Sequence, residues 1–523
     1  MARYRLGRFR LASLLTALAL VPTLAGVPTA ASAAGSAPQP GGTMTVLENA
    51  GLSGAWPQGL DPATNTSDLA DDPYMESIYG NLFEQQANGK MVPDLASGYK
   101  FIDGNKTLEI FLRHGVTFQD GTPFNAAAVA WNIKRDLDPA NACICDSSFP
   151  VASITTQGKY TVLMHLKTVY APILESFAQA APNWIASPTA YQKMGAKAFA
   201  LNPVGAGPFQ VVSDTVNSKL VLKKYDHYWQ KGHPYLDNLV FESIGQDQSA
   251  YSAIVAGQAN LEQGTAIYAV VQAAEKNSKI KVTTIPGAGS GGIQLNTLAA
   301  PFNNIKAREA IYYATDPQAL NKALSGGTGT VSQSGDGPAS LFPDLKVPGY
   351  RTYDLAKAKA LVQQLGGLSF TITDLSFDNF FAEALQSEWM QAGMKVQINP
   401  VPIITLNKAF ATKNWDVVVP GGCGGTDPAI GLAGMAWRCL STGPFTGLDD
   451  HKLDSMINAG TGTLNVEKRA KTYSQIFEYL SQHAYIPFTY AAATHNIAST
   501  NAHGPGIDSP LATPWWQDAW ISH

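Results

Sequence analysis

The chain has no excess of positive charge and none of the motifs that mark common catalytic sites. It contains 36 basic and 40 acidic residues, and without residues 1–33 these become 32 and 40, a net charge of −8. A mildly acidic chain with scattered charges lacks the basic footprint of a nucleic-acid-binding protein. No G-x-x-x-x-G-K-[ST] phosphate loop, G-x-S-x-G turn or H-E-x-x-H pair occurs. The nine histidines are dispersed, so neither a protein-coordinated metal nor a cofactor is expected.

One glycine-rich segment imitates a nucleotide-binding motif. Residues 287–292, GAGSGG, satisfy G-x-G-x-x-G. A dinucleotide site needs a strand before this motif and a helix directly after it. No strong helical pattern follows here, so dinucleotide binding is not expected.

Cysteine is scarce, with four residues in the chain. In an exported protein they make disulfides possible, and Cys423 and Cys439, which flank a glycine-rich loop, are the pair we expect to be bonded. Cys143 and Cys145 are separated by one residue, so a bond between them would close a strained ring. A metal or redox site at this pair is an alternative, but no histidine or second cysteine pair is near it in the sequence.

Long apolar runs are absent after the N-terminus. Residues 1–33 combine four arginines, an apolar run over 11–27 and the small residues Ala31-Ser32-Ala33, a pattern typical of a secretory signal peptide. A membrane anchor is the alternative, but Pro22 and Pro28 interrupt the roughly 20 apolar residues it needs. No cysteine follows the run, so a lipid anchor is not supported. The mature chain is therefore expected to be exported, with residues 34–42 as a flexible lead-in.

A compact unit occupies residues 108–135, LEIFLRHGVTFQDGTPFNAAAVAWNIKR. Apolar residues alternate with polar ones over 108–112, which predicts a half-buried strand. The HG and DG pairs predict two turns. Asn125 is a good N-cap for a helix over 126–137, which Pro139 ends. The unit contains no catalytic group, which indicates a role in architecture.

Similar patterns fill the rest of the chain. A first strand is expected at 43–47 and a helix at 73–83. Further strands are expected at 220–223, 239–244, 368–373, 395–400 and 416–419. Further helices are expected at 249–256, 305–314, 354–365 and 379–392. Strand–helix–strand alternation in the later half predicts a mainly parallel sheet. A chain of this length is expected to form two or three domains, and the absence of a linker suggests that they are interleaved.

Several blocks in consistent order resemble one family, the extracytoplasmic solute-binding proteins of the peptide/nickel class that serve ABC importers. The first is the R-x-G-V-x-F-x-D-G-x-P-F block formed by Arg113, Gly115, Val116, Phe118, Asp120, Gly121, Pro123 and Phe124. NPVGAGPFQV from Asn202 is similar to a second block, with Ala206 where threonine is usual. The blocks YDHYW from Tyr225, PYLD from Pro234 and APFNNIKAREAIYYATDPQAL from Ala300 follow, and residues 354–366 match a Y-D-x-x-K-A-K helix.

The resemblance implies an α/β, two-lobed periplasmic-binding-protein fold of type II, with discontinuous domains around a hinge. Lobe I would comprise residues 43–85, 203–290 and 485–523. An extra subdomain, 86–202, would be inserted in it, and lobe II would be 291–484. Hinge closure would enclose a ligand between the lobes, and the closed form would be presented to a membrane permease.

The loop after the strand at 416–419 is the main ligand-binding candidate. A loop at the carboxyl end of a strand, facing a crevice, is where open α/β sheets bind ligands, and glycines admit close approach to the backbone. Its candidates are Gly421, Gly422, Cys423, Gly424, Gly425 and Asp427. In the family this loop resembles G-D-x-x-D-P, whose first aspartate pairs with a peptide's free amine in many members. Gly424 stands where that aspartate would be, although a disulfide-stapled structural turn is the alternative for the loop.

The departure at Gly424 leaves the ligand open. A peptide with a free ammonium would need another carboxylate, for which Glu48 is the candidate, because losing one partner of an enclosed charge pair costs about 2–5 kcal/mol. Otherwise the ligand is a blocked peptide or not a peptide. The remaining lining candidates are Glu48, Asn49, Ala50, Asn183, Trp184, Asn296 and Tyr490. Each aromatic is more often a core residue than a ligand platform, and Asp427 could simply cap its loop.

The expected function is that of a monomeric, non-catalytic receptor that binds a small peptide or similar polar solute in an inter-lobe cleft and delivers it to an ABC permease. A non-peptide solute such as a sugar or metal chelate, or a sensory role, is the alternative. A secreted glycosidase would need two carboxylates about 5–10 Å apart across a cleft, and no pair has telling spacing. The protein is expected in the periplasm or the cell envelope, held by an outer membrane or a protein partner unless it is released.

Overall fold

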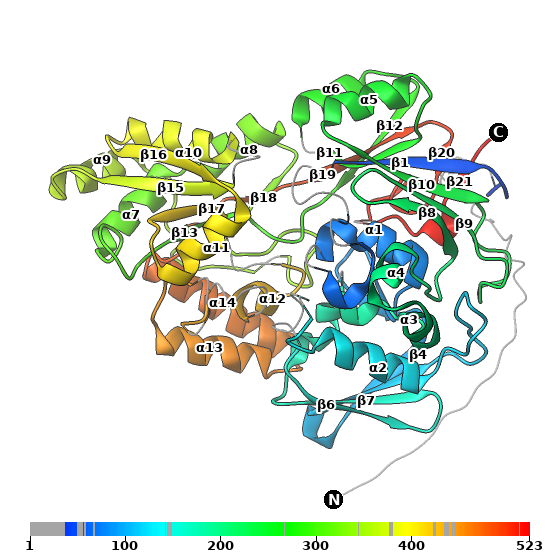
Figure 1. Cartoon of the computed structure of the whole chain (residues 1–523). Coiled ribbons are helices and arrows are strands. Elements are labelled where there is room, and N and C mark those ends of the chain that lie inside the picture. The colour runs from blue at the N-terminus through cyan, green and yellow to red at the C-terminus, as the bar shows by residue number, and fades with distance from the viewer. Residues whose placement is uncertain are drawn as a thin grey trace, which may run out of the picture. The chain divides into compact units, whose positions relative to one another are not determined.

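The computed structural model describes residues 37–523, apart from short gaps. The gaps are at residues 50–55, 57–58, 66–67, 142, 144–148, 179, 266, 344, 376–379, 422–424, 434–438, 442, 444–445 and 512. Residues 38–523 belong to one unit, in which several β-sheets are flanked by helices (Figure 1). The chain is therefore an α/β protein, as its sequence predicts.

A seven-stranded sheet gathers three distant segments of the chain. Its order is β12-β19-β11-β1-β10-β9-β8. The strands are β1 (Thr43–Asn49), β8 (Phe209–Thr215), β9 (Lys219–Lys224), β10 (Asn238–Ile244), β11 (Leu261–Thr265), β12 (Ile280–Ile285) and β19 (Thr494–Ser499). Strand β1 pairs in parallel with β10 and β11, and the other pairs are antiparallel. Figure 1 shows the blue β1 among green strands and the red-brown β19.

Both faces of this sheet are buried at β1, and the alternation along this strand shows why. Val46 faces a core shared with α1 (Asp68–Tyr79), whereas Leu47 faces a second core under α5 (Asp247–Val255) and α6 (Tyr268–Glu275). Successive side chains of a strand point to opposite faces. An apolar run such as MTVL can therefore fill both cores at once.

A four-stranded antiparallel sheet, in the order β4-β5-β7-β6, comes from the segment that precedes β8. Its strands are β4 (Ala96–Ile102), β5 (Thr107–Leu112), β6 (Val151–Gln157) and β7 (Thr161–Leu166). Helix α2 (Ala126–Asp136) packs on it through Val129 and Ile133. The Asn125 side chain accepts a 3.0 Å hydrogen bond from the Ala128 amide, which confirms the predicted N-cap.

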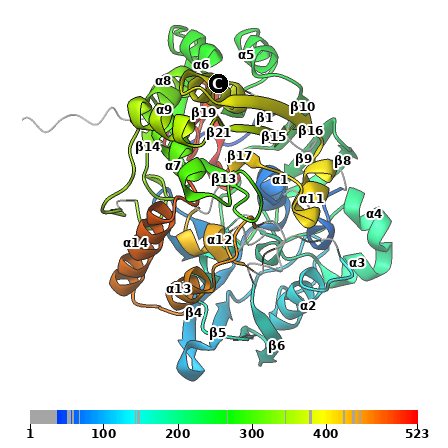
Figure 2. The same cartoon turned by 90° about the vertical axis from the view of Figure 1, so that its left-hand side faces the viewer.

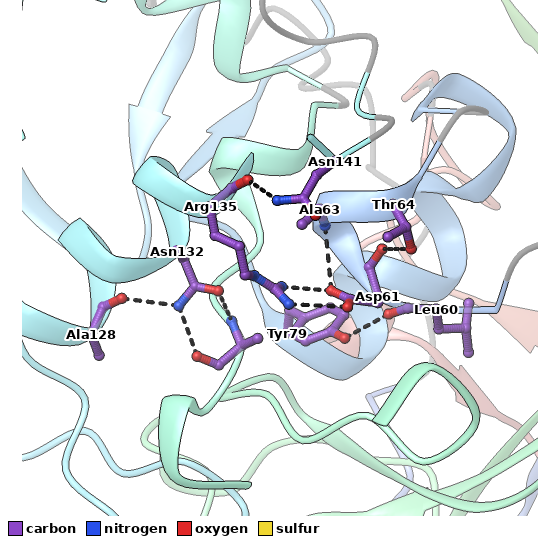
Figure 3. A network of polar contacts seen from close by, with 10 residues as sticks. Leu60, Asp61, Ala63, Thr64, Tyr79, Ala128, Asn132, Arg135 and Asn141 are labelled. Atoms are coloured by element: carbon purple, nitrogen blue, oxygen red, sulfur yellow. Dashed lines mark hydrogen bonds and ion pairs between the residues drawn. The ribbon is translucent and has the colours of Figure 1, made fainter. Parts of the chain in front are cut away.

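A buried ion pair joins α2 to the segment before α1 (Figure 3). Arg135 donates two hydrogen bonds to Asp61, at 3.0 and 2.5 Å, and its guanidinium lies 4.4 Å from the ring centre of Tyr191. Asn132 donates to the carbonyls of Ala128 and Ala186, at 2.9 and 2.8 Å. Because both charges are buried and share two hydrogen bonds, the pair fixes one placement of α2 against this segment.

A further sheet, in the order β13-β17-β15-β16, lies in the later half of the chain. Its strands are β13 (Gly292–Leu295), β15 (Ser369–Leu375), β16 (Lys395–Val401) and β17 (Val417–Gly421). Strand β15 pairs in parallel with β16 and β17, and β13 is an antiparallel edge. The helices α7 (Ile305–Ala314), α9 (Leu355–Gln364) and α10 (Phe380–Gln391) share its main core, and α11 (Ile403–Thr412) packs against a separate one. The predicted mainly parallel sheet is confirmed.

A helical layer follows this sheet. It contains α12 (Pro428–Ala433), α13 (His451–Thr461) and α14 (Val466–Gln482), which lie together in Figure 2 and share one apolar core. The smaller elements are β2 (Phe83–Gln85), β3 (Met91–Pro93), β14 (Thr330–Val331), β18 (Tyr490–Ala491), β20 (Ala502–His503), β21 (Trp520–Ile521), α3 (Pro188–Met194), α4 (Ala196–Leu201) and α8 (Pro317–Ser325). In the described part of the chain, no helix combines the length and apolar character needed to cross a bilayer.

One predicted element is displaced. The helix expected at 73–83 starts at Asp68 and ends at Tyr79, because Gly80 adopts a φ of +64° that terminates a helix. Phe83 lies in β2 instead. The boundaries given above for the two lobes and the inserted subdomain stay predictions.

Candidate functional site

A cavity of about 300 Å³ lies where the chain crosses between the seven-stranded sheet and the sheet of β13. One crossing runs from the end of β12 to β13, and the other runs from β18 to the start of β19. The two crossings hydrogen-bond to each other, since the Gly291 amide donates to the Tyr490 carbonyl at 3.0 Å and the Thr489 amide donates to the Gly291 carbonyl at 2.9 Å. The cavity is lined by Asp72, Glu76, Asn81, Phe83, Glu84, Gln85, Gln86, Ala87, Ala178, Asn183, Ile285, Pro286, Gly287, Ala288, Ala339, Thr426, Ala492, Thr494, Pro510, Leu511, Thr513 and Trp515.

The hairpin of β2 and β3 brings the two sides of the cavity together. Gln85 donates a 3.1 Å hydrogen bond to the hydroxyl of Thr426 in the loop that follows β17. At the tip of the hairpin, Gly89 has no room for a side chain, because a Cβ would lie 2.8 Å from the Ala339 carbonyl oxygen. The site therefore combines residues near positions 85 and 426 that are far apart in the sequence.

Acidic side chains form one wall. Asp72 and Glu76 lie on α1, one turn apart, and Glu84 lies on β2. Burial, reinforced by mutual repulsion with neighbouring carboxylates, raises the pKa of Glu76 and of Glu84 well above its usual range. Burial also raises the pKa of the adjacent Asp94 to about 7, although Arg113 opposes this shift. Sequence reasoning missed this wall, and the i, i+4 spacing of Asp72 and Glu76 was the available signal.

Two acceptors on this wall lack hydrogen-bond partners within the described residues. They are Glu76 Oε1 and Asn81 Oδ1, and both residues are more than nine-tenths buried. Asp72 differs, because Thr513 donates a hydrogen bond to it. Buried polar atoms in native proteins nearly always have a partner, so these two acceptors indicate that a donor is missing beside this wall.

Of the predicted ligand-binding residues, Asn183 is placed on the cavity. Its amide is already engaged, accepting from the Phe83 amide and donating to the Phe83 carbonyl, both at 2.9 Å. Its neighbour Trp184 is fully buried in the core under α1 and does not line the cavity. The structure thus separates two residues that the sequence placed together.

Asp427 is occupied by structural contacts. It is 0% exposed, and its carboxylate accepts from the Ala429 amide at 2.9 Å and from the Tyr473 hydroxyl at 2.8 Å. It also forms a 3.2 Å ion pair with Arg469, which is 4% exposed. Burial still raises the pKa of Asp427 despite the guanidinium. These contacts favour the structural alternative for Asp427, while its neighbour Thr426 lines the cavity.

The other described candidates do not line this cavity. Asn296 fixes a loop, donating to the carbonyls of Lys413 and Trp415 at 3.0 and 2.8 Å. Tyr490 is buried beside the crossing, where its hydroxyl accepts from Ser325 at 3.2 Å. The remaining described candidates are Glu48 and Asn49 at the end of β1, Gly421 at the end of β17, and Gly425.

Several sequence predictions fall outside the described residues. They concern Ala50, Gly422, Cys423 and Gly424. Cys143 and Cys439 are each disulfide-bonded. The predicted pairing of Cys439 with Cys423 stays a prediction, because Cys423 is not described.

The glycine-rich segment at 287–292 runs into β13 rather than a helix, so it does not form a dinucleotide-binding turn. Among the residues that the structure describes, no group of three or more His, Cys, Asp or Glu side chains is arranged to hold a metal ion. The cavity instead presents carboxylates, amides and apolar side chains, which suit recognition of an organic solute.

Comparison with known proteins identifies the family. The model of the bacterial extracellular solute-binding proteins, family 5 (middle region), matches residues 90–443. The chain belongs to this family. The glutathione-binding protein GsiB of Escherichia coli K12 is 30% identical over 352 residues, which cover 65% of this chain and 66% of that relative, just under two thirds of its length.

Solved structures of this kind share the fold. The periplasmic binding protein DppA of Helicobacter pylori, in complex with the peptide STSA, superposes with a TM-score of 0.78 at 20% identity, covering 93% of this chain and 99% of that one. The binding protein AgaA of A. tumefaciens R10, in complex with agropinic acid, gives a TM-score of 0.74 at 22% identity, covering 92% and 99%. The predicted two-lobed periplasmic-binding-protein fold is thereby confirmed.

Proposed function

We propose that this protein is the extracytoplasmic receptor of an ABC importer, which encloses a small peptide or similar polar solute and delivers it to a membrane permease. The observation that carries the proposal is the cavity at the two crossings between sheets, in a chain of a solute-binding family. A rotation about two short crossings changes the distance between the sheets while each sheet stays intact. The solute stabilises the closed form only as far as it binds that form more tightly.

The peptide assignment draws support from relatives. GsiB is named for glutathione and DppA was solved with a peptide, whereas AgaA was solved with agropinic acid. A non-peptide solute or a sensory role remains the alternative, and a glycosidase the remote one. These relatives are binding proteins, which favours a receptor without catalysis.

The proposal includes export. Residues 1–33 would serve as a signal peptide, the mature chain would act in the periplasm or cell envelope, and a Cys423–Cys439 disulfide would brace the loop beside the cavity. Peptide sequencing of the mature N-terminus tests the cleavage site, for which residue 34 is the expected first residue.

Native mass spectrometry of protein purified from its own host tests the receptor function. We expect a bound solute of peptide size that dissociates chemically unchanged, together with a change in fluorescence on rebinding, because Trp515 lines the cavity. Conversion of the solute on incubation, or identical scattering profiles with and without it, would contradict a receptor that closes on its cargo.

A further inference from the structure

The wall formed by Asp72, Glu76, Asn81 and Glu84 has a use that the family assignment does not specify. We propose that it is a subsite for an organic cation, and that an ammonium or guanidinium group of the solute docks between Glu76, Asn81 and Glu84. This inference rests on the proposed receptor function, since it names the chemical group by which the solute is recognised.

The first argument is hydrogen bonding. Glu76 and Asn81 line the cavity, and Glu76 Oε1 and Asn81 Oδ1 are buried without a hydrogen-bond partner among the described residues, although the Asn81 side chain lies close enough to the Glu76 carboxyl to lower its pKa. Asn81 Oδ1 only accepts hydrogen bonds, and Glu76 Oε1 does so once its carboxyl is ionised, so a partner for both atoms must carry N–H or O–H groups. An ammonium carries three donors and a guanidinium five, and either can serve several acceptors at once.

The second argument is charge. No Lys, Arg or His is found among the described residues that line the cavity. Asp94 and Asp518 add negative charge close to Glu84. Arg113 acts on Asp94, since it lowers the pKa of that carboxyl and donates to its backbone carbonyl, and it lies over the ring of Trp229, 4.4 Å from its centre. His233 in turn pairs with Asp518 at 3.2 Å.

Ionised together, Glu76 and Glu84 would repel each other, and burial keeps water from screening them. Burial is the main cause of their raised pKa values, and repulsion from neighbouring carboxylates adds to it. A cation placed between them would remove the repulsion, so it would be held more tightly than a neutral group of the same shape.

The third argument is size and lining. A cavity of about 300 Å³ is roughly ten times the volume of one water molecule in the liquid. Apolar side chains line part of it, namely Phe83, Ile285, Pro286, Leu511 and Trp515. Such a lining suits the carbon skeleton of an organic cation, whereas apolar side chains offer no ligands to a bare metal ion.

The same chemistry separates this chain from its glutathione-binding relatives. Glutathione carries one ammonium and two carboxylates at neutral pH, and each carboxylate would need a cation or several donors. The described lining has three carboxyl groups and no Lys, Arg or His, so the donors that it offers are neutral amides and hydroxyls. We therefore infer a solute with more positive than negative charge, at least in the part that enters this cavity.

Binding measurements on matched probes test the subsite. The probes are Ala-Ala-Ala with a free or acetylated amine, acetyl-Ala-Lys-Ala against acetyl-Ala-norleucine-Ala, glutathione, and agmatine as a cation that is not a peptide. They are titrated by calorimetry into the wild type, Glu76→Gln, Glu84→Gln and the control Glu262→Gln. Glu262 is also a buried carboxylate with a raised pKa, but it lies on β11 outside the cavity lining.

We expect at least one charged peptide probe to bind the wild type about tenfold or more tightly than its neutral counterpart. This preference should fall at least about fivefold in Glu76→Gln and in Glu84→Gln, and stay within about twofold in Glu262→Gln. Agmatine has no neutral counterpart among the probes, and its affinity should fall in Glu76→Gln and in Glu84→Gln. Because glutamine has nearly the same shape as glutamate, a thermal unfolding scan of each variant checks that it is folded.

Each result separates the two proposals. Neutral and charged peptides binding equally would overturn the cation subsite and leave the peptide receptor standing. Agmatine binding alone would support the subsite and contradict the peptide assignment. The subsite is also overturned if no charged probe binds, or if the preference survives in both cavity variants.

Discussion

The Asp427–Arg469 pair allows a direct test of whether Asp427 is a structural or a ligand-binding residue. Both side chains are buried, and their 3.2 Å ion pair lies between α12 and α14. We consider Asp427→Asn, which keeps an oxygen for the Ala429 amide and the Tyr473 hydroxyl while it removes the negative charge. Arg469 then stays buried without its ion-pair partner, and Glu175, whose pKa burial raises to about 7, is an acidic side chain that still interacts with it.

The expected cost follows from that stranded guanidinium. Removing one partner of a buried ion pair destabilises a protein by about 3–5 kcal/mol, because the remaining charge has lost its compensation. Asp427→Ala should cost about 1 kcal/mol more, since it also removes the side chain that caps α12. In Asp427→Asn/Arg469→Met the stranded charge is gone, and replacing a whole buried pair by apolar groups is often neutral. The double variant should therefore be more stable than Asp427→Asn.

Urea unfolding followed by tryptophan fluorescence, together with calorimetric titration of the host-derived solute, measures both roles. We expect the free energy of unfolding to fall in Asp427→Asn and to recover in the double variant, with solute affinity changed less than about threefold in the double variant. Wild-type stability in Asp427→Asn, combined with loss of solute binding, would refute the structural role and restore Asp427 as a ligand-binding residue.

Three further outcomes follow from the structure. Gly205→Ala should unfold the protein or lower its midpoint strongly in a thermal unfolding scan, because the new Cβ would lie 2.5 Å from Tyr79 Cα and against the Ile78 carbonyl. Gly245 has open space around it, so Gly245→Ala should be nearly neutral in the same scan. Burial raises the pKa of Glu262 to about 8, so the stability that this group contributes is present below its ordinary pKa and is lost as the pH rises through 8. Glu262→Gln should therefore raise the thermal midpoint more at pH 9 than at pH 5. An equal effect at both pH values would contradict the raised pKa. Binding of an organic cation should release protons from Glu76 and Glu84, whose pKa values are raised. The buffer takes up these protons, so the calorimetric enthalpy of binding at pH 7 should differ between phosphate and Tris. Identical enthalpies would argue against ionisation on binding.

Local signals predicted much of the fold. The strand, turns and helix expected over 108–137 appear as β5, two positive-φ glycines and α2, because alternation, turn residues and an N-cap act over a few neighbouring residues. Helix α7 occupies the predicted residues 305–314 for the same reason. The α1 boundary was wrong, since the sequence pattern continued through Gly80 while the backbone turned there.

The site was harder to predict because it depends on contacts between distant segments. No residue near Asp427 in the sequence indicates that it contacts Arg469 and Tyr473, which come from a helix some 40 residues away. Likewise, Glu76 and Glu84 look like ordinary surface acids in a linear sequence. They are buried because distant segments pack around α1 and β2, as the contacts of α1 with β8 and of Glu84 with Gln517 show.

The position of the acidic wall gives the departure at Gly424 a physical meaning. The family resemblance leads one to expect a carboxylate for the solute's amine in the loop after β17, and the sequence has glycine there. The described cavity carries its carboxylates on α1 and β2, and Thr426 of that same loop also lines it. In the proposed subsite, the solute's cation would therefore pair with carboxylates of α1 and β2 in place of a carboxylate in that loop. The cation subsite therefore accounts for two independent facts, the missing loop aspartate and the unsatisfied acceptors of Glu76 and Asn81, with one arrangement of the solute.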